Sequence, residues 1–131
     1  MRCLVPADGF YEWEATPAGK QPWFLRLKSQ APLAFAGLWE HWQGPDGAPL
    51  ETATIITTDA NELVRPVHDR MPVILQPADW AAWLGAKTAP EDLKALLKPL
   101  PADLMERYRV SRRMSNARSE GEECMAPWRG D

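Results

Sequence analysis

Thirteen prolines are distributed through the 131 residues of this chain, and they constrain its fold more than any other feature. Proline has no backbone N–H and interrupts both helix interiors and central strands. The chain therefore favours short strands and turns over a bundle of long helices. Hydrophobic residues make up 45% of the chain and charged residues 25%, a balance that is typical of a globular domain and excludes a disordered chain. We expect a single domain over residues 1–131.

Local patterns predict an α+β fold that is rich in strands. Two helices are expected, at 76–84 with Gly85 as its C-cap, and at 88–97 behind a capping box formed by Thr88 and Glu91. A second capping box, Asp59 to Glu62, predicts a short helix that ends before Pro66. Apolar or alternating runs between turn residues indicate strands at 2–5, 9–14, 23–27, 33–39, 52–57, 71–75 and 108–111, and the run at 33–39 is apolar enough to be buried on both faces.

Nothing in the sequence directs the chain to a membrane. No apolar run reaches the roughly 18 residues that a membrane-spanning helix needs, and the first residues lack the apolar segment of a signal peptide. Two cysteines, Cys3 and Cys124, are too few for a disulfide framework. We therefore expect a cytoplasmic protein with reduced thiols.

The segment 6–13 contains an acid in an apolar setting. If it is a strand, alternation places Glu12 on one face with Phe10, and Tyr11 with Trp13 on the other. A carboxylate beside Phe10 is a candidate for a partly buried acid with a raised pKa. The alternative is a glutamate at the rim of the domain, paired with an arginine.

His68 lies between the predicted short helix and the strand at 71–75, where side chains are displayed on a rigid scaffold. An imidazole can exchange a proton near neutral pH, and Asp69 or Glu12 would orient it. The alternative is a histidine that only closes a loop through its ring nitrogens. Cys3, His41, His68 and Cys124 lack the paired spacing of metal ligands, and no glycine-rich phosphate loop occurs, so we expect neither a metal nor a cofactor.

A local basic strip occupies residues 107–118, which hold five arginines and no acid in a chain of net charge −3. Arginines bind phosphates, and exposed tryptophans stack on unpaired bases. The strip, with Tyr108 and Asn116, is therefore a candidate contact for phosphates and unpaired bases. A solvated edge strand is the alternative explanation of the arginines.

Three segments together resemble the signatures of the SRAP (SOS response-associated peptidase) family. The first is Arg-Cys-Leu-Val-Pro-Ala-Asp-Gly-Phe-Tyr-Glu-Trp at 2–13. The second is Ile-Thr-Thr-Asp-Ala-Asn at 56–61 followed by His-Asp-Arg-Met-Pro at 68–72. The third is Val-Ser at 110–111 with Asn116. The resemblance extends over the whole chain in the right order and implies a mostly antiparallel SRAP-like sheet or barrel with a few short helices.

The resemblance implies a DNA-repair protein that binds abasic sites in single-stranded DNA and is linked to them covalently. In the family the nucleophile is an N-terminal cysteine, exposed by autoproteolytic removal of the initiator methionine, which gives the peptidase, hydrolase and lyase descriptions. The family's active-site acid and histidine match Glu12 and His68, and its DNA-binding positions match Trp13, Thr57, Arg70 and Arg2. We therefore expect Arg70 and some arginines of the strip 107–118 to converge near Trp13 and to bind single-stranded DNA. A response to DNA damage would bring such a protein to the nucleoid.

The chain also departs from the family pattern. It begins at the Arg-Cys-Leu signature, and the segment that carries the nucleophilic cysteine is not in it; Cys3 matches a structural cysteine of the family. We therefore interpret the chain as the C-terminal portion of an SRAP domain. The alternatives are a non-catalytic single-stranded DNA-binding fragment, a degenerate paralogue, and a structural relic whose uncovered strand edges, such as 33–38, pair with another copy.

Overall fold

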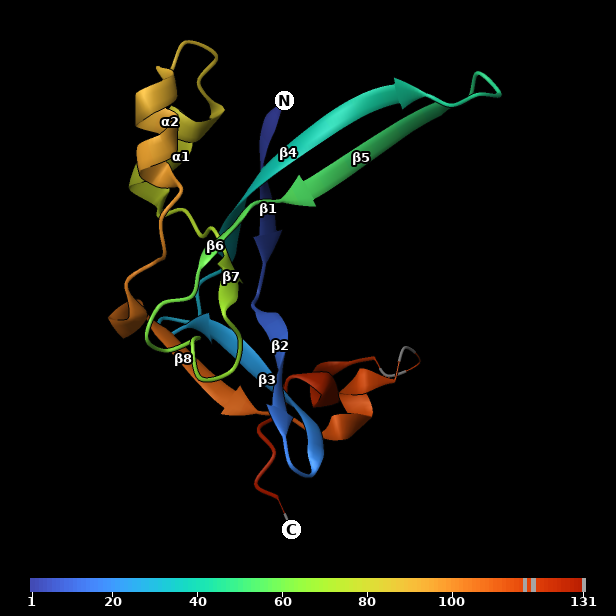
Figure 1. The fold of residues 1–131 in the computed structure, drawn as a ribbon, viewed down its shortest axis with the longest axis vertical. Helices are drawn as coiled ribbons and strands as arrows, with labels where there is room; N and C mark the ends of the chain where they lie inside the picture. Colours follow the sequence, from blue (N-terminus) through green and yellow to red (C-terminus); the bar gives the residue numbers. More distant parts are fainter. Residues whose placement is uncertain (117, 119, 131) are drawn as a thin grey trace.

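The computed structural model describes residues 1–116, 118 and 120–130, which form three antiparallel sheets and a pair of short helices (Figure 1). One sheet has the strand order β1-β4-β5, the second β2-β3-β8, and the third β6-β7. The strands are β1 (Arg2–Ala7), β2 (Phe10–Thr16), β3 (Gly19–Leu27), β4 (Leu33–Gln43), β5 (Pro49–Ile55), β6 (Thr57–Asp59), β7 (Arg70–Pro72) and β8 (Met105–Arg109). The α-helices are α1 (Pro77–Leu84) and α2 (Pro90–Leu96), and the single 3-10 turns are η1 (Ala102–Leu104), η2 (Arg112–Ser115) and η3 (Glu122–Cys124).

The predicted strand-rich α+β fold is confirmed, with open sheets among the described residues rather than a closed barrel. The main core lies between the sheets, where Leu25 of β3, Leu33 and Phe35 of β4, and Met71 of β7 are buried with Val64. A second cluster joins β4 to the helices through the buried side chain of Trp83. No helix in the described part of the chain is long and apolar enough to cross a membrane.

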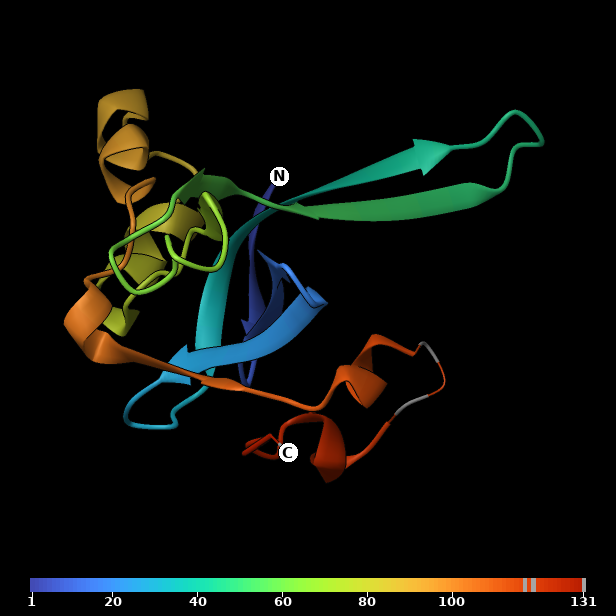
Figure 2. The same cartoon turned by 60° about the horizontal axis from the view of Figure 1, so that its bottom comes forward.

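Strands β4 and β5 continue beyond the core as a two-stranded ribbon that projects from the body (Figures 1 and 2). The prediction of burial on both faces is correct for residues 33–37, which are buried, and wrong beyond Gly37. Leu38, Trp42, Leu50 and Ile55 are exposed along the ribbon. The reason is that no other element in the described part of the chain covers the ribbon, so apolar content alone does not determine burial.

The capping boxes of the sequence do not form. No helix follows Asp59; the chain makes successive turns over 62–67, because Asp59 is the last residue of β6 and pairs there with Arg70 of β7. Helix α2 begins after Ala89 without a side-chain cap, while the Thr88 hydroxyl donates to the Ala82 carbonyl of the preceding helix at 2.6 Å. Gly85 ends α1 in an extended conformation (φ −67°, ψ 124°), which any residue can adopt.

The sheet β2-β3-β8 presents two different faces. The cross-strand register places Glu12, Trp23 and Arg109 in one row on one face. The opposite face carries Tyr11 and Tyr108, whose hydroxyls donate to the backbone carbonyls of Cys124 and Met125. Cys124 and Met125 are thereby held against this second face, while the first face carries the buried Leu25 of the main core and, in the next row of side chains, the site described below.

Candidate functional site

Glu12 and His68, which are far apart in the sequence, meet at the edge of the β2-β3-β8 sheet. Glu12 is in the middle of β2, and His68 lies two residues before β7. His68 Nε2 is 3.9 Å from Glu12 Oε2, too long for a direct hydrogen bond but close enough for an ion pair or one bridging water. The structure therefore brings together the two residues that the sequence singled out for proton transfer.

The Glu12 carboxylate is held in a setting that favours its protonated form. Its side chain is only 22% exposed. Burial raises the pKa of Glu12; His68 lowers it in part, and the Asp69 carboxylate raises it further. Among the described residues, the ion-pair partner of Glu12 is the His68 imidazole and not the arginine that the alternative of a rim glutamate requires.

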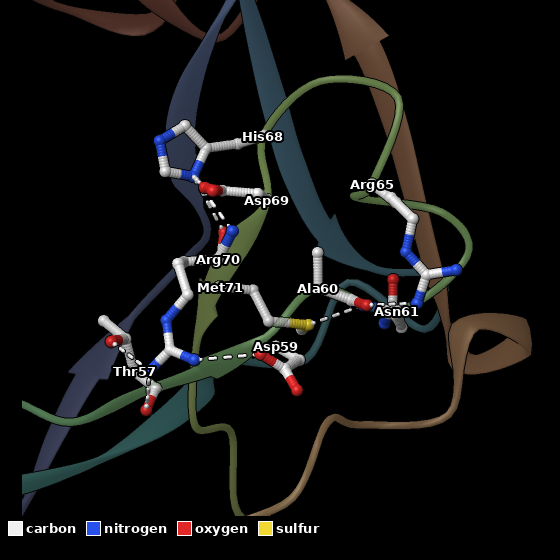
Figure 3. A network of polar contacts seen from close by, with 9 residues as sticks. All are labelled: Thr57, Asp59, Ala60, Asn61, Arg65, His68, Asp69, Arg70 and Met71. Atoms are coloured by element: carbon white, nitrogen blue, oxygen red, sulfur yellow. Dashed lines mark hydrogen bonds and ion pairs between the residues drawn. The ribbon is translucent and has the colours of Figure 1, made fainter.

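The two ring nitrogens of His68 have different partners. Nδ1 accepts a hydrogen bond from the backbone N–H of Arg70 at 3.2 Å and lies 3.1 Å from the Arg70 carbonyl and 3.5 Å from Asp69 Oδ1 (Figure 3). When Nδ1 accepts, the neutral ring carries its proton on Nε2, the atom that faces Glu12. His68 thus closes a loop through one nitrogen, as one reading of the sequence had it, and offers the other to Glu12.

Asn61 supports the loop that carries His68. It is 5% exposed, and its Oδ1 accepts from the N–H groups of Leu63 and Val64 at 3.1 and 3.0 Å, while its Nδ2 donates to the Leu100 carbonyl at 2.8 Å. The first turn after β6 is therefore capped by Asn61 and anchored to a distant part of the chain. The Val64 carbonyl in turn accepts from the His68 N–H at 2.9 Å.

Thr57 and Arg70 lie together across the β6–β7 pair. The Arg70 guanidinium donates to the Thr57 carbonyl and hydroxyl at 3.0 and 3.1 Å, and to Asp59 Oδ1 at 3.0 Å (Figure 3). Both Arg70 and Asp59 are exposed. Arg70 is thus held in one orientation beside the His68 loop, with an exposed guanidinium.

Trp13 and Arg2 point elsewhere. Alternation along β2 places Trp13 on the face opposite to Glu12, where its Nε1 donates to Ser115 Oγ at 2.9 Å. Arg2 donates to the carbonyls of Trp83 and Gly85 at 2.6 Å each and so satisfies the C-terminal end of α1. The structure therefore does not bring these two residues to the Glu12–His68 pair.

The first two arginines of the basic strip lie over Trp23 rather than near Trp13. Arg107 and Arg109 lie over the ring of Trp23, at 4.3 and 5.4 Å from the ring centroid, on the face that carries Glu12. Arg112 donates to the Ala18 carbonyl at the turn between β2 and β3. Trp23, the centre of this cluster, could not be identified from the sequence, because neither β3 nor β8 alone shows the register in which the two strands pair.

The cysteines are not arranged for metal binding. Among the described residues, no group of three His, Cys, Asp or Glu side chains could hold a metal ion. Cys3 is a strand residue of β1 and packs against Gly37 of β4; a Cβ at Gly37 would lie 2.9 Å from its sulfur. Its thiol is part of the contact between two strands.

Comparisons with known proteins agree on one family. The model of the family "SOS response associated peptidase (SRAP)" matches residues 1–117. Abasic site processing protein YoqW of Bacillus subtilis (strain 168) is 48% identical over 126 residues, covering 95% of this chain and 56% of that protein. Abasic site processing protein HMCES of Gallus gallus is 34% identical over 146 residues, covering 96% of this chain and 43% of that protein.

The fold is shared with a protein of solved structure. A crystal structure of a protein from Bacteroides thetaiotaomicron superposes with a TM-score of 0.83 at 31% identity, covering 87% of this chain and 51% of that one. The chain spans about half the length of the curated relatives it matches.

Proposed function

The chain belongs to the SOS response associated peptidase (SRAP) family, and from this premise we propose that it takes part in the processing of abasic sites in single-stranded DNA. The names of its relatives, abasic site processing proteins from a bacterium and a vertebrate, support this substrate. The observation that carries the proposal is the 3.9 Å approach of His68 Nε2 to Glu12 Oε2 beside the exposed Arg70.

The chemistry proposed is the capture of the ring-opened sugar aldehyde by an N-terminal cysteine. The α-amine attacks the aldehyde carbon, and the carbonyl oxygen is protonated and leaves as water, which gives a Schiff base. The thiol then adds to the imine carbon, its proton passes to the nitrogen, and a thiazolidine ring closes. Only a residue that has both an amine and a thiol can complete both steps. The same cysteine, once the initiator methionine is removed, accounts for the peptidase name of the family.

Glu12 and His68 supply the proton transfers in this scheme. A carboxyl group whose pKa is raised by burial can take the proton from the attacking amine and return it to the departing water. A protonated His68 gives its Nε2 proton to the sugar ring oxygen as the ring opens. Thr57 and Arg70 contact the DNA backbone next to this pair, and we assign Trp13 and Arg2 to more distant contacts with DNA.

A denaturing gel of protein mixed with an abasic single-stranded oligonucleotide tests this chemistry. The 131-residue chain should give no denaturation-stable adduct, because Met1 has no thiol and Cys3 lies within β1. A longer version that begins with a processed cysteine should give one. In that version, Glu12→Ala should slow capture and His68→Ala should slow ring opening, each by about 10²-fold or more.

Two matched variants control for the loss of an acid or an imidazole. Glu40→Ala and His41→Ala, both exposed on the β4–β5 ribbon, should leave the rate of adduct formation unchanged. A stable adduct from the 131-residue chain would mean that Cys3 or a lysine is the nucleophile, and the mechanism would then be wrong at its first step.

A second candidate function is a non-catalytic module that binds single-stranded DNA. It is favoured by the position of Cys3, whose thiol packs between β1 and β4 and cannot serve as a terminal nucleophile. This candidate predicts binding of single-stranded DNA by the long version without any adduct. The gel therefore distinguishes the two functions.

A further inference from the structure

Two arginines share one tryptophan ring on the face of the β2-β3-β8 sheet that carries Glu12. Trp23 of β3 is paired in register with Glu12 of β2 on one side and with Arg109 of β8 on the other. The Arg109 guanidinium lies 5.4 Å from the Trp23 ring centroid, and that of Arg107 lies 4.3 Å from it. Both arginines therefore face the same way as the Glu12–His68 pair.

The charge of this cluster is not neutralised by the described part of the chain. The nearby Glu14 carboxylate accepts from Trp23 Nε1 at 3.1 Å, and within the described residues neither arginine has a carboxylate within ion-pair distance. The Nε atom of Arg107 is buried without a hydrogen-bond partner. Two like charges gathered at one ring repel each other, so the arrangement is stabilised when an anion lies between or above them.

We propose that Arg107, Trp23 and Arg109 form a contact for the sugar–phosphate backbone of the strand whose abasic sugar lies at Glu12 and His68. This inference rests on the proposed function and adds to that of Arg70 a second backbone contact, two strands across the sheet from Glu12. Adjacent strands are about 4.8 Å apart, so Arg109 lies ~10 Å from Glu12 across the sheet, within reach of a phosphate flanking the lesion.

The chemistry of the three side chains favours nucleic acid over an acidic peptide. The exposed Arg109 guanidinium presents a planar fork that matches two phosphate oxygens, and the ring of Trp23 offers an aromatic surface beside it. A strand that passes from Arg70 over Glu12 to Arg109 would follow one face of the sheet without crossing it.

Fluorescence anisotropy with a labelled single-stranded oligonucleotide containing an abasic analogue tests the proposal. We expect Arg109→Gln to weaken binding by the 131-residue chain about tenfold, as the loss of one charge-assisted contact does. The slope of log affinity against log salt concentration should fall by about 0.7, the value for one phosphate of a single strand. Arg109→Lys keeps the charge and should restore the slope.

Arg107→Gln should also weaken binding and lower the salt slope, and circular dichroism shows whether this variant folds. Because Arg109 is exposed, Arg109→Gln gives a result even if Arg107→Gln does not fold. The matched control is Lys94→Gln, which removes one positive charge from the exposed side of α2.

If the unmodified chain binds and Arg109→Gln matches Lys94→Gln in affinity and slope, this inference is wrong and the proposed function stands. If the unmodified chain does not bind single-stranded DNA, the proposed function itself is wrong. Displacement of the DNA by poly-glutamate at equal charge concentration would favour an acidic protein partner and overturn the inference.

Discussion

Replacement of Asn61 by alanine removes the side chain that caps the turn carrying His68. Besides a contact of its Nδ2 with the Met105 sulfur at 3.6 Å, the buried amide makes three hydrogen bonds with nitrogen and oxygen partners, which are the N–H groups of Leu63 and Val64 and the Leu100 carbonyl. Each is worth about 1 kcal/mol, and more when a buried partner is left unsatisfied, so the free energy of unfolding should fall by about 3 kcal/mol. For a domain of this size, that is a large share of the total stability.

Urea denaturation followed by tryptophan fluorescence measures this loss as a lower midpoint at an unchanged m-value. Glu62→Ala is the matched control, because the capping-box reading of the sequence assigns the stabilising role to Asp59 and Glu62 rather than to Asn61. Glu62 is exposed, and its replacement should change the unfolding free energy by no more than about 0.5 kcal/mol. A loss below about 1 kcal/mol for Asn61→Ala, or a larger loss for Glu62→Ala, would refute the assignment of the cap.

Three further outcomes follow from other contacts. Because burial raises the pKa of Glu12, the folded state binds the proton of this carboxyl group more tightly than the unfolded chain does. The resulting stabilisation is complete below the pKa of the unfolded state and is lost as the pH rises through the pKa of the folded state. The melting temperature of the wild type should therefore fall relative to that of Glu12→Gln as the pH rises above about 4, the ordinary pKa of a glutamate; a constant difference contradicts it. Gly9→Ala would place a Cβ against the Phe24 ring and 2.5 Å from the Leu25 carbonyl oxygen, so denaturation should show a loss of about 1–3 kcal/mol or more, and wild-type stability would disprove the clash. Arg26→Ala removes a 2.7 Å ion pair with Glu106 and a cation–π contact with Tyr108. A double-mutant cycle with Glu106→Ala should give a coupling energy of about 1 kcal/mol for the ion pair, and a coupling energy of zero counts against it.

The alternation in β2 is a local property, and it predicted correctly which face of the sheet each of its side chains occupies. A strand alternates its side chains whatever it is paired with, so the separation of Glu12 from Tyr11 and Trp13 could be derived from residues 10–13 alone. The residues alone left open whether Asp69 or Glu12 orients His68, since no periodicity relates a strand to a loop so far along the chain, and only the family resemblance singled out Glu12 with His68.

The errors arise where a distant element decides the local structure. Asp59 to Glu62 has the pattern of a helix start, but Asp59 is held by the β6–β7 pairing and its carboxylate by Arg70, so Asn61 caps the turn instead. Likewise, the arginines of β8 lie over Trp23 because β8 pairs with β3 on the side away from β2. Strand order is a tertiary property, and it determined which aromatic ring the basic strip contacts.

The two faces of β2 place a limit on how the gene for this protein can change. Even-numbered positions such as Phe10 and Glu12 serve one face, and odd-numbered positions such as Tyr11 and Trp13 hold the segment that follows β8. An in-frame insertion or deletion of a single codon within this strand would exchange both sets at once. The turns on either side of β2 can vary in length, but the number of residues from Gly9 to Trp13 must stay the same for each side chain to keep its face. Insertions and deletions in homologous genes should therefore be confined to the loops.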